Sequence, residues 1–314
     1  MQRVLVTGAA SWLGKTVVSR LANRPQIEVF AADRQKMDVP VAVDRYQGGI
    51  DRLSFAEYLL EVRPHAVIHL APIDRKGSPG AVAGAQALFG AIGRCAETET
   101  VIVKSDTSVY GSGPRSPSVF SEKDIPAHGK QLRFQRRLSE LEAFVEEVAA
   151  RQPATKYAVL RFATIIGPTI GNAMSRYLRL PAVPVLGGFD PRLQFIYEQD
   201  AVRSILHALD YPQSGVINVT ADGQLYLSRI LRLGGRLPQP MPGRAFRAVR
   251  KGLGAMDIEL TEDMEALLRY GRVVDTTRMT AEFEFTPALN CRQSVMATYE
   301  RIPRAALPQE VTVD

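Results

Sequence analysis

The feature that most constrains this chain is a glycine turn between a short apolar strand and a helix, close to the N-terminus. The sequence TGAASWLG, residues 7–14, follows an apolar run at 3–6 and precedes apolar positions at helical spacing over 15–22. Gly8 is expected to form the tight turn, and Gly14 to let the helix pack close to the strand. Such a turn is typical of dinucleotide binding, because the amide groups at the helix N-terminus face the pyrophosphate.

The N-terminal half alternates between predicted strands and predicted helices. Buried strands are predicted from β-branched and apolar runs at 27–32, 66–70, 101–103 and 157–162. Helical patterns lie between these runs at 55–62, 82–95 and 132–150. This alternation predicts right-handed crossovers and a parallel sheet with helices on both faces. The predicted fold class is therefore α/β, a doubly wound parallel sheet of the Rossmann kind, with ligands at the carboxyl ends of its strands.

The pattern becomes irregular after Gly167 and Pro168, where proline and glycine are frequent and the apolar runs are short. We therefore predict a dinucleotide-binding domain at 1–168 and a smaller C-terminal substrate lobe mainly at 169–314. Apolar runs at 195–208 and 216–219 resemble a return to the main sheet. The first domain is accordingly expected to include a returning segment at about 194–220.

The second predicted strand ends at Asp33, which bears on the choice of cofactor. It lies 19 residues beyond Gly14, where a carboxylate can accept hydrogen bonds from both ribose hydroxyls and repels a 2′-phosphate. NAD is therefore favoured, while Arg34 can pair with a 2′-phosphate and keeps NADP open. Ser11 replaces the usual middle glycine, so the backbone should approach the phosphates less closely. The predicted contacts of the turn are Gly8, Ala10, Ser11, Trp12, Leu13 and Gly14.

Further motifs run along almost the whole chain. They are HLAP at 69–72, SVYG at 108–111, LRFATIIGP at 160–168, QFIYEQDAV at 194–202 and RVVDTTRMTAEFEFTP at 272–287. With the glycine turn and Asp33, they resemble the extended short-chain dehydrogenase/reductases, the NAD-dependent epimerases and dehydratases of nucleotide sugars, and within them actinobacterial proteins of the UDP-glucose 4-epimerase-like kind. The resemblance implies a nucleotide-linked small molecule as ligand and a homodimer. It adds these cofactor contacts: Leu70, Ala71, Pro72, Phe162 and Ile165.

The resemblance also implies a catalytic tyrosine and a lysine four residues apart on one helix. The lysine lowers the tyrosine pKa, so that the phenolate can accept a hydroxyl proton as hydride leaves for the nicotinamide. Here the helix reads FQRRLSELE at 134–142, and its SELE aligns with the acidic tail of the family motif. Phe134 then stands at the tyrosine position and Leu138 at the lysine position. Neither side chain can transfer a proton.

The hydroxyl that should precede this pair is also displaced. Asp106 stands at the serine or threonine position, four residues before Tyr110, and Thr107 follows it directly. Thr107 and Tyr110 are therefore the catalytic candidates that the sequence retains. The substrate-phosphate arginine of the family would fall on Leu193, with Arg192 displaced by one residue.

One segment of the C-terminal half is strongly basic. Between Asp222 and Asp257 there is no acidic residue, although the whole chain has 39 basic and 33 acidic residues. The segment contains Arg229, Arg232, Arg236, Arg244, Arg247, Arg250 and Lys251. Phe246, Val249 and Leu253 share one helical face within it, which is a pattern typical of a membrane surface or an acidic partner.

Composition excludes several other classes. Cys95 and Cys291 lie far apart and form no metal-ligand spacing with the four histidines, so we expect no metal and two buried thiols in a reducing cytoplasm. No apolar run approaches the length of a transmembrane segment. The moderate charge, without a nucleic-acid-binding motif, argues against nucleic acid as a partner.

Three functions remain open from the sequence. The first is a weakly active or atypical epimerase, dehydratase or reductase of nucleotide-linked sugars that uses NAD and substitute acid–base groups. The second is a non-catalytic NAD(P)-binding sensor or assembly partner, which the residues at 134 and 138 favour. The third is a peripheral membrane or acidic-partner protein that binds through Arg229–Lys251.

Overall fold

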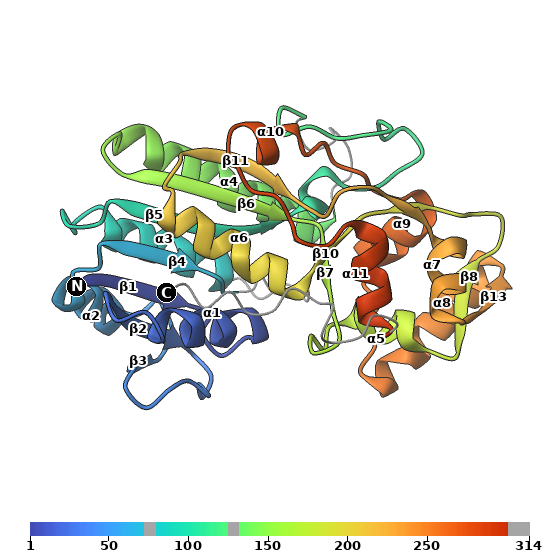
Figure 1. Cartoon of the computed structure of the whole chain (residues 1–314), viewed down its shortest axis with the longest axis horizontal. Helices are drawn as coiled ribbons and strands as arrows, with labels where there is room; N and C mark the ends of the chain where they lie inside the picture. The colour runs from blue at the N-terminus through green and yellow to red at the C-terminus, as the bar shows by residue number, and fades with distance from the viewer. Residues whose placement is uncertain (72–79, 125–131, 301–314) are drawn as a thin grey trace. The chain divides into compact units, whose positions relative to one another are not determined.

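The apolar run near the N-terminus forms strand β1 (Gln2–Thr7), which is buried from Val4 onward. It pairs in parallel with β2 (Ile27–Asp33) on one side and with β4 (Ala66–His69) on the other, so it lies inside a sheet. Figure 1 shows the protein in a computed structural model, which describes residues 1–71, 80–124 and 132–300.

The chain forms two compact units and crosses between them several times. The first unit comprises Met1–Ser105, Arg133–Arg161 and Val202–Ile217. The second unit comprises Asp106–Leu132, Phe162–Ala201 and Asn218–Asp314. The predicted division into a dinucleotide-binding domain at 1–168, with a return at about 194–220, and a substrate lobe stays a prediction.

A seven-stranded parallel sheet forms the centre of the first unit, in the order β11-β6-β5-β4-β1-β2-β3. The other strands are β3 (Asp44–Gln47), β5 (Thr100–Asp106), β6 (Lys156–Phe162) and β11 (Gly215–Val219). Asp106, Phe162 and the last two residues of β11 are grouped with the second unit. The polar sequence DRYQ of β3 lacks the apolar signal of a strand, because this strand lies at the edge of the sheet.

Helices cover both faces of this sheet, as Figure 1 shows. One face packs against α2 (Leu53–Val62), α3 (Gly80–Ile92) and α4 (Arg133–Arg151) in a core that includes Leu5, Phe30, Phe89 and Val145. The other face carries α1 (Trp12–Ala22) and α6 (Glu198–Asp210). The predicted doubly wound α/β fold is therefore confirmed.

The second unit contains three short strand pairs and several helices around its own core. The pairs are β7 (Thr164–Ile166) with β10 (Phe195–Tyr197), β8 (Ala182–Leu186) with β13 (Leu237–Met241), and β9 (Arg192–Leu193) with β12 (Leu225–Tyr226). The helices are α5 (Ala173–Arg179), α7 (Leu227–Gly234), α8 (Gly243–Leu253), α9 (Glu262–Tyr270), α10 (Thr277–Ala281) and α11 (Cys291–Thr298), with 3-10 turns η1 (Thr107–Tyr110) and η2 (Gly254–Met256).

Two expectations from the sequence differ from the structure. The run at 216–219 does join the main sheet as β11, but Phe195–Tyr197 pairs with β7 in a separate two-stranded sheet. The face of Phe246, Val249 and Leu253 is not available as a whole for binding a membrane or a partner, because Phe246 and Leu253 are buried in the core of the second unit. A helix on a protein surface turns its largest apolar residues inward, which leaves only Val249 of the three exposed.

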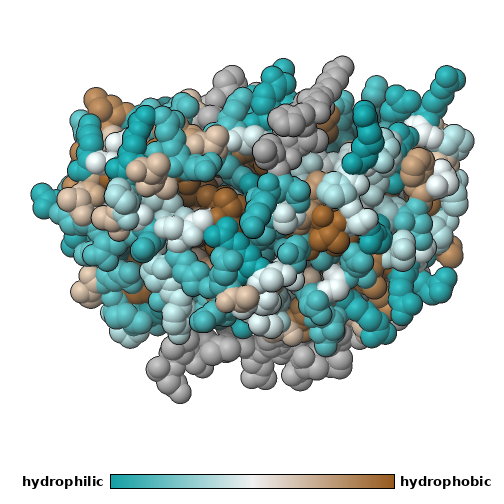
Figure 2. Space-filling view, turned by 90° about the horizontal axis from the view of Figure 1, so that it is seen from above, coloured by the Kyte–Doolittle hydropathy of each residue, from teal (hydrophilic) through white to brown (hydrophobic). Residues whose placement is uncertain are grey.

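One face of the molecule can be described by its hydropathy. In Figure 2, hydrophilic residues cover most of the face shown and hydrophobic residues form separate small areas. No helix within the described residues has both the length and the apolar content to cross a membrane. Cys95 and Cys291 are buried free thiols, as the sequence predicts.

Candidate cofactor site

The glycine turn joins β1 to α1 in the first unit. Gly8 has a φ of +78°, and a Cβ atom added there would lie 2.4 Å from the Ala71 amide nitrogen. A Cβ atom added at Gly14 would lie 2.1 Å from the Gly8 carbonyl oxygen. Side-chain atoms are excluded at both positions by neighbouring backbone, so the turn requires glycine there for close packing of strand, turn and helix.

Ser11 has a structural task at the position where a glycine is usual. It is the N-cap of α1, and its Oγ accepts a hydrogen bond from the Gly14 amide at 3.0 Å. The same hydroxyl donates to the Gly8 carbonyl at 2.8 Å. Ser11 therefore stabilises the turn and occupies one of the amides that a phosphate would otherwise use. Trp12 and Leu13 are the first two residues of the helix, half-buried and buried respectively.

Asp33 lies at the end of β2 and faces the same turn. Its Oδ2 accepts from the Ala10 amide at 3.0 Å, and its Oδ1 accepts from the Gln35 amide at 2.8 Å. Two backbone donors therefore orient the carboxylate at the beginning of α1. Arg34 forms an ion pair with Asp51 at 3.3 Å, in which both side chains are largely exposed. The guanidinium is thus already partnered by an acid.

The end of β4 brings a histidine beside the glycine turn. The Leu70 amide donates to the Thr7 carbonyl, and the Thr7 hydroxyl lies 2.7 Å from Nδ1 of His69. Burial lowers the pKa of His69 to about 4, with a smaller contribution from the charge of Lys104. His69 is therefore neutral at neutral pH. Leu70 is buried and Ala71 half-buried, whereas Pro72, also predicted as a contact, lies outside the described residues.

This histidine makes a testable contribution to acid stability. The unfolded chain takes up a proton near the ordinary pKa of 6.5, but the folded chain does so only near 4, so stability falls as the pH falls through this window. Between pH 7 and 5 the wild type should lose about 2 kcal/mol more than His69→Gln. Urea unfolding, monitored by the fluorescence of Trp12, the single tryptophan, measures the stability of the wild type and of His69→Gln at each pH. Equal losses in the two proteins would contradict the assignment, and above pH 7.5 the two should respond alike.

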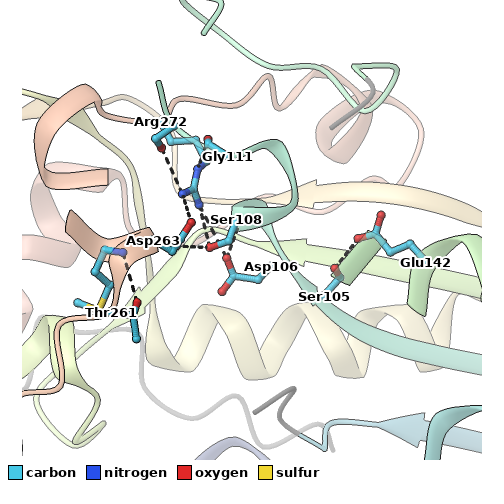
Figure 3. Close-up of polar contacts among 10 residues, drawn as sticks. Ser105, Asp106, Ser108, Gly111, Glu142, Thr261, Asp263 and Arg272 are labelled. Carbon is cyan, nitrogen blue, oxygen red and sulfur yellow. Dashed lines mark hydrogen bonds and ion pairs between the residues drawn. The ribbon is translucent and has the colours of Figure 1, made fainter. Parts of the chain in front are cut away.

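One face of α4 carries Phe134 and Leu138, which the sequence analysis aligns with a tyrosine–lysine pair. Phe134, Leu138 and Glu142 follow one another at four-residue spacing, and all three are buried. The Glu142 carboxylate binds the Arg161 guanidinium of β6, with Nε at 3.0 and 3.1 Å from its two oxygens and Nη2 at 2.5 Å from Oε2. The Ser105 hydroxyl donates to the same carboxylate (Figure 3). The face is thus apolar at two positions and ion-paired at the third.

The remaining catalytic candidates lie in the second unit, on η1. Tyr110 is 1% exposed, its hydroxyl donates to Oδ1 of Asn218 at 2.7 Å, and its ring stacks on Phe120 at a centroid distance of 5.0 Å. Thr107 is also buried, at the first position of the turn. Contacts of this kind are those of a packed, hydrogen-bonded phenol. The catalytic roles of Thr107 and Tyr110 stay predictions.

A buried polar network surrounds η1 within the second unit (Figure 3). The Ser108 hydroxyl donates to Asp263 at 2.8 Å and accepts from Arg272 Nη1 at 3.0 Å, while Arg272 Nη2 lies 3.2 Å from Asp263. Arg272 Nε also donates to the Gly111 carbonyl at 3.0 Å. Asp106 caps η1 by accepting from the Ser108 amide at 2.7 Å. The network orders the segment that follows β5, since each buried charge is paired.

Sequence reasoning did not connect Ser108, Asp263 and Arg272. They are up to 164 positions apart, and a local pattern carries no signal for such a contact. The other predicted residues of the second unit are Phe162 at the end of β6 and Ile165 on β7, both buried. Leu193 is buried too, and Arg192 donates to the Ser118 carbonyl at 3.0 Å.

Comparison with known proteins places these motifs in a wider group. The model of the NAD dependent epimerase/dehydratase family matches residues 4–220. An uncharacterised protein of Mycobacterium tuberculosis is 33% identical over 299 residues, covering 90% of this chain and 80% of that protein. Among solved structures, the UDP-glucose 4-epimerase of Thermotoga maritima with UDP-glucose has a TM-score of 0.72 and 20% identity, covering 95% of this chain and 98% of its own.

A second solved structure carries both kinds of ligand. The UDP-glucuronic acid 4-epimerase of Bacillus cereus, in complex with UDP-glucuronic acid and NAD, has a TM-score of 0.73 and 16% identity. The alignment covers 95% of this chain and 98% of that one. At these identities the two structures establish a shared fold.

Proposed function

The chain belongs to the NAD-dependent epimerase/dehydratase family, and we propose that it binds NAD in its first unit but lacks the family's usual proton-transfer pair. The observation that carries this proposal is the buried face of α4, where Phe134 and Leu138 precede an ion-paired Glu142. NAD supplies a hydride acceptor when bound. The protein's own residues would have to hold the dinucleotide and move a proton. The chain has the usual family residues for the first of these roles but not for the second.

The turn fits a dinucleotide in shape and charge. The first turn of α1 has no acidic residue of its own, so no carboxylate within the helix competes with a phosphate for its N-terminal amides. Gly8, Ala10, Ser11 and Gly14 would border the pyrophosphate by close approach of the backbone, with the Ala10 and Gly14 amides already bonded to Asp33 and Ser11. The Asp33 carboxylate, oriented by the Ala10 amide, would accept from the adenosine ribose.

The remaining predicted cofactor contacts and a second ligand are part of the same proposal. Trp12, Leu13, Leu70 and Ala71 of the first unit would border the dinucleotide. Phe162 and Ile165, which the resemblance also adds, belong to the second unit, and Pro72 lies outside the described residues. NAD is favoured over NADP because the Asp33 carboxylate repels a 2′-phosphate, and Arg34, the cation that could bind one, is paired with Asp51. The second ligand would be a nucleotide-linked small molecule, since the structural relatives include complexes with UDP-glucose and UDP-glucuronic acid.

A weak or atypical reaction would use other groups in place of the missing pair. Thr107 and Tyr110 stay the candidates for that role, and Asp106 adds a carboxylate that can accept but not donate a proton when ionised. The alternative is a non-catalytic sensor or assembly partner that binds NAD(P) without turnover. Two buried hydrocarbon side chains at the proton-transfer positions favour this alternative. We place either form in the cytoplasm as a homodimer.

Quenching of Trp12 fluorescence by NADH provides the direct test of dinucleotide binding. The indole stands at the beginning of α1, so NADH bound at the turn should quench it by energy transfer. Asp33→Ala should weaken NADH binding by about 1–3 kcal/mol, the cost of losing hydrogen bonds to a charged acceptor, or roughly 5- to 150-fold. Titration calorimetry with NAD and NADP checks the same affinities without a fluorophore.

Asp38→Ala is the matched control, because its carboxylate is 98% exposed and lies in the same loop region. It should leave NADH affinity within about twofold, as expected for a surface substitution. Absence of binding to either dinucleotide at millimolar concentration would refute the proposal. Tighter binding of NADPH than NADH would show that Arg34 leaves Asp51 and dominates Asp33.

A further inference from the structure

We propose that α8, together with η2, is a docking surface for an anionic lipid bilayer. The helix reads GRAFRAVRKGL, and every polar side chain in it is a cation. A helix that only meets water normally exposes acidic and uncharged polar groups as well. The exposed side of α8 instead combines basic side chains with small and apolar ones.

Burial divides the helix into an inner and an outer side. Phe246 and Leu253 are buried in the core of the second unit and attach the helix to it. Arg250 lies on their flank, where it pairs with Glu265 of α9 at 3.4 Å. The inner side of α8 is therefore fully used by the protein itself.

The outer side carries two adjacent rows, which follow from the rotation of about 100° per residue. One row consists of Arg244, Arg247 and Lys251, all exposed. The other row consists of Ala245, Ala248, Val249 and Gly252, also exposed. Met256 of η2 follows directly and is 60% exposed, which extends the apolar row by one large side chain. A surface of this kind can lie in a bilayer interface, with apolar groups inserted beside basic ones.

The positive charge of the basic row is not neutralised locally. Within the part of the chain that the structure describes, no carboxylate forms an ion pair with Arg244, Arg247 or Lys251. The nearest acidic residues in sequence are Asp222 and Asp257, outside the helix. Guanidinium groups bind phosphate bidentately and an ammonium binds it as a point charge, so this row of two arginines and one lysine is complementary to a layer of lipid phosphates.

The size of the apolar residues favours a bilayer over an acidic protein. Specific protein interfaces are anchored by large side chains that fill a pocket on the partner, most often tryptophan, tyrosine or arginine at the centre of the patch. The apolar row of α8 offers only alanine, glycine and one valine. The single aromatic residue, Phe246, faces inward, so Arg244 and Arg247 stand without an aromatic anchor between them. Small residues let the helix lie flat on a fluid surface, where distributed charge matters more than fitted shape.

Sedimentation of the full chain with vesicles tests this proposal. We expect the protein to bind vesicles of phosphatidylglycerol and phosphatidylcholine at low salt, to bind phosphatidylcholine alone much more weakly, and to be released at high salt. The variant R244E/R247E/K251E should lose roughly 100-fold or more in affinity, since each cation near an anionic membrane contributes several-fold. M256Q should weaken binding by a smaller factor without changing its salt dependence.

The variant R52E/R94E/K156E is the matched control. It changes the net charge by the same amount at three exposed positions of the first unit, and it should retain most of the vesicle binding. Circular dichroism checks folding, and R244Q/R247Q/K251Q replaces the charge reversal if that variant unfolds. Equal binding to neutral and anionic vesicles, or unchanged binding of the α8 variants, would overturn the proposal. Salt-sensitive binding to polyglutamate without binding to anionic vesicles would also overturn it, in favour of an acidic protein.

Discussion

Purified protein incubated with NAD and UDP-glucose is expected to form UDP-galactose at a trace rate at most. General acid–base catalysis typically contributes about 10²- to 10⁴-fold. In the proposed alignment, the positions that should supply it hold Phe134 and Leu138, two buried hydrocarbon side chains. Separation of the two nucleotide sugars by chromatography over hours measures this rate. Turnover at several per second would refute the alignment of α4 or reveal substitute groups, and Tyr110→Phe would then test the first of them.

The double change Phe134→Tyr with Leu138→Lys should raise the rate toward that of an ordinary member of the family. Either single change should do little, because a tyrosine without the lysine keeps a pKa near 10 and stays protonated at neutral pH. Leu138 is 2% exposed, so the new ammonium is buried unless the phenolate pairs with it. Thermal unfolding of each variant is therefore measured alongside the rate.

The two outcomes separate the two forms of the proposed function. A folded double variant that gains turnover would show that NAD and the sugar already bind in a productive arrangement, which supports descent from an enzyme. NADH binding without turnover in any variant would favour the sensor or assembly role. The absence of both binding and turnover would refute the proposal at its first step, independently of the membrane surface on α8.

Glu142→Ala is expected to destabilise the first unit by about 3–5 kcal/mol. The substitution leaves the Arg161 guanidinium buried without its carboxylate, and an unpaired buried charge is costly. The matched control lies on the same helix, where Glu147 forms an exposed ion pair with Arg151 four residues later. Glu147→Ala should cost at most about 0.5 kcal/mol, since such surface pairs are screened by water. Urea unfolding monitored by Trp12 fluorescence compares the two variants.

A double replacement tests the charge pairing of Glu142 with Arg161. Replacing both partners, as Glu142→Met with Arg161→Met, should recover most of the lost stability, because no buried charge is then left unpaired. A double variant as unstable as Glu142→Ala would show that packing around α4, rather than charge pairing, is responsible. A single variant as stable as the wild type would contradict the role of the pair altogether.

The sequence by itself determined the fold class and the cofactor turn. Strand, turn and helix at residues 2–22 are signalled by neighbours along the chain: β-branched runs, helical spacing and two glycines. Asp33 could be assigned for the same reason, since it ends a strand that the local pattern predicts. Each of these inferences depends on interactions within about one turn, strand or helix. Phe134 and Leu138 stay a prediction that rests on the resemblance, through the alignment of SELE with the family motif.

Only the tertiary structure decided which side chains meet. Tyr110 remained a catalytic candidate in sequence, yet its hydroxyl donates to Asn218, 108 positions away. The pairing of Glu142 with Arg161 joins a helix to a strand. Phe246 was expected beside Val249 on a binding face, but the core of the second unit covers it. Contacts between distant segments depend on how elements pack, and packing is decided by the summed burial of many residues, which leaves no local pattern in the sequence.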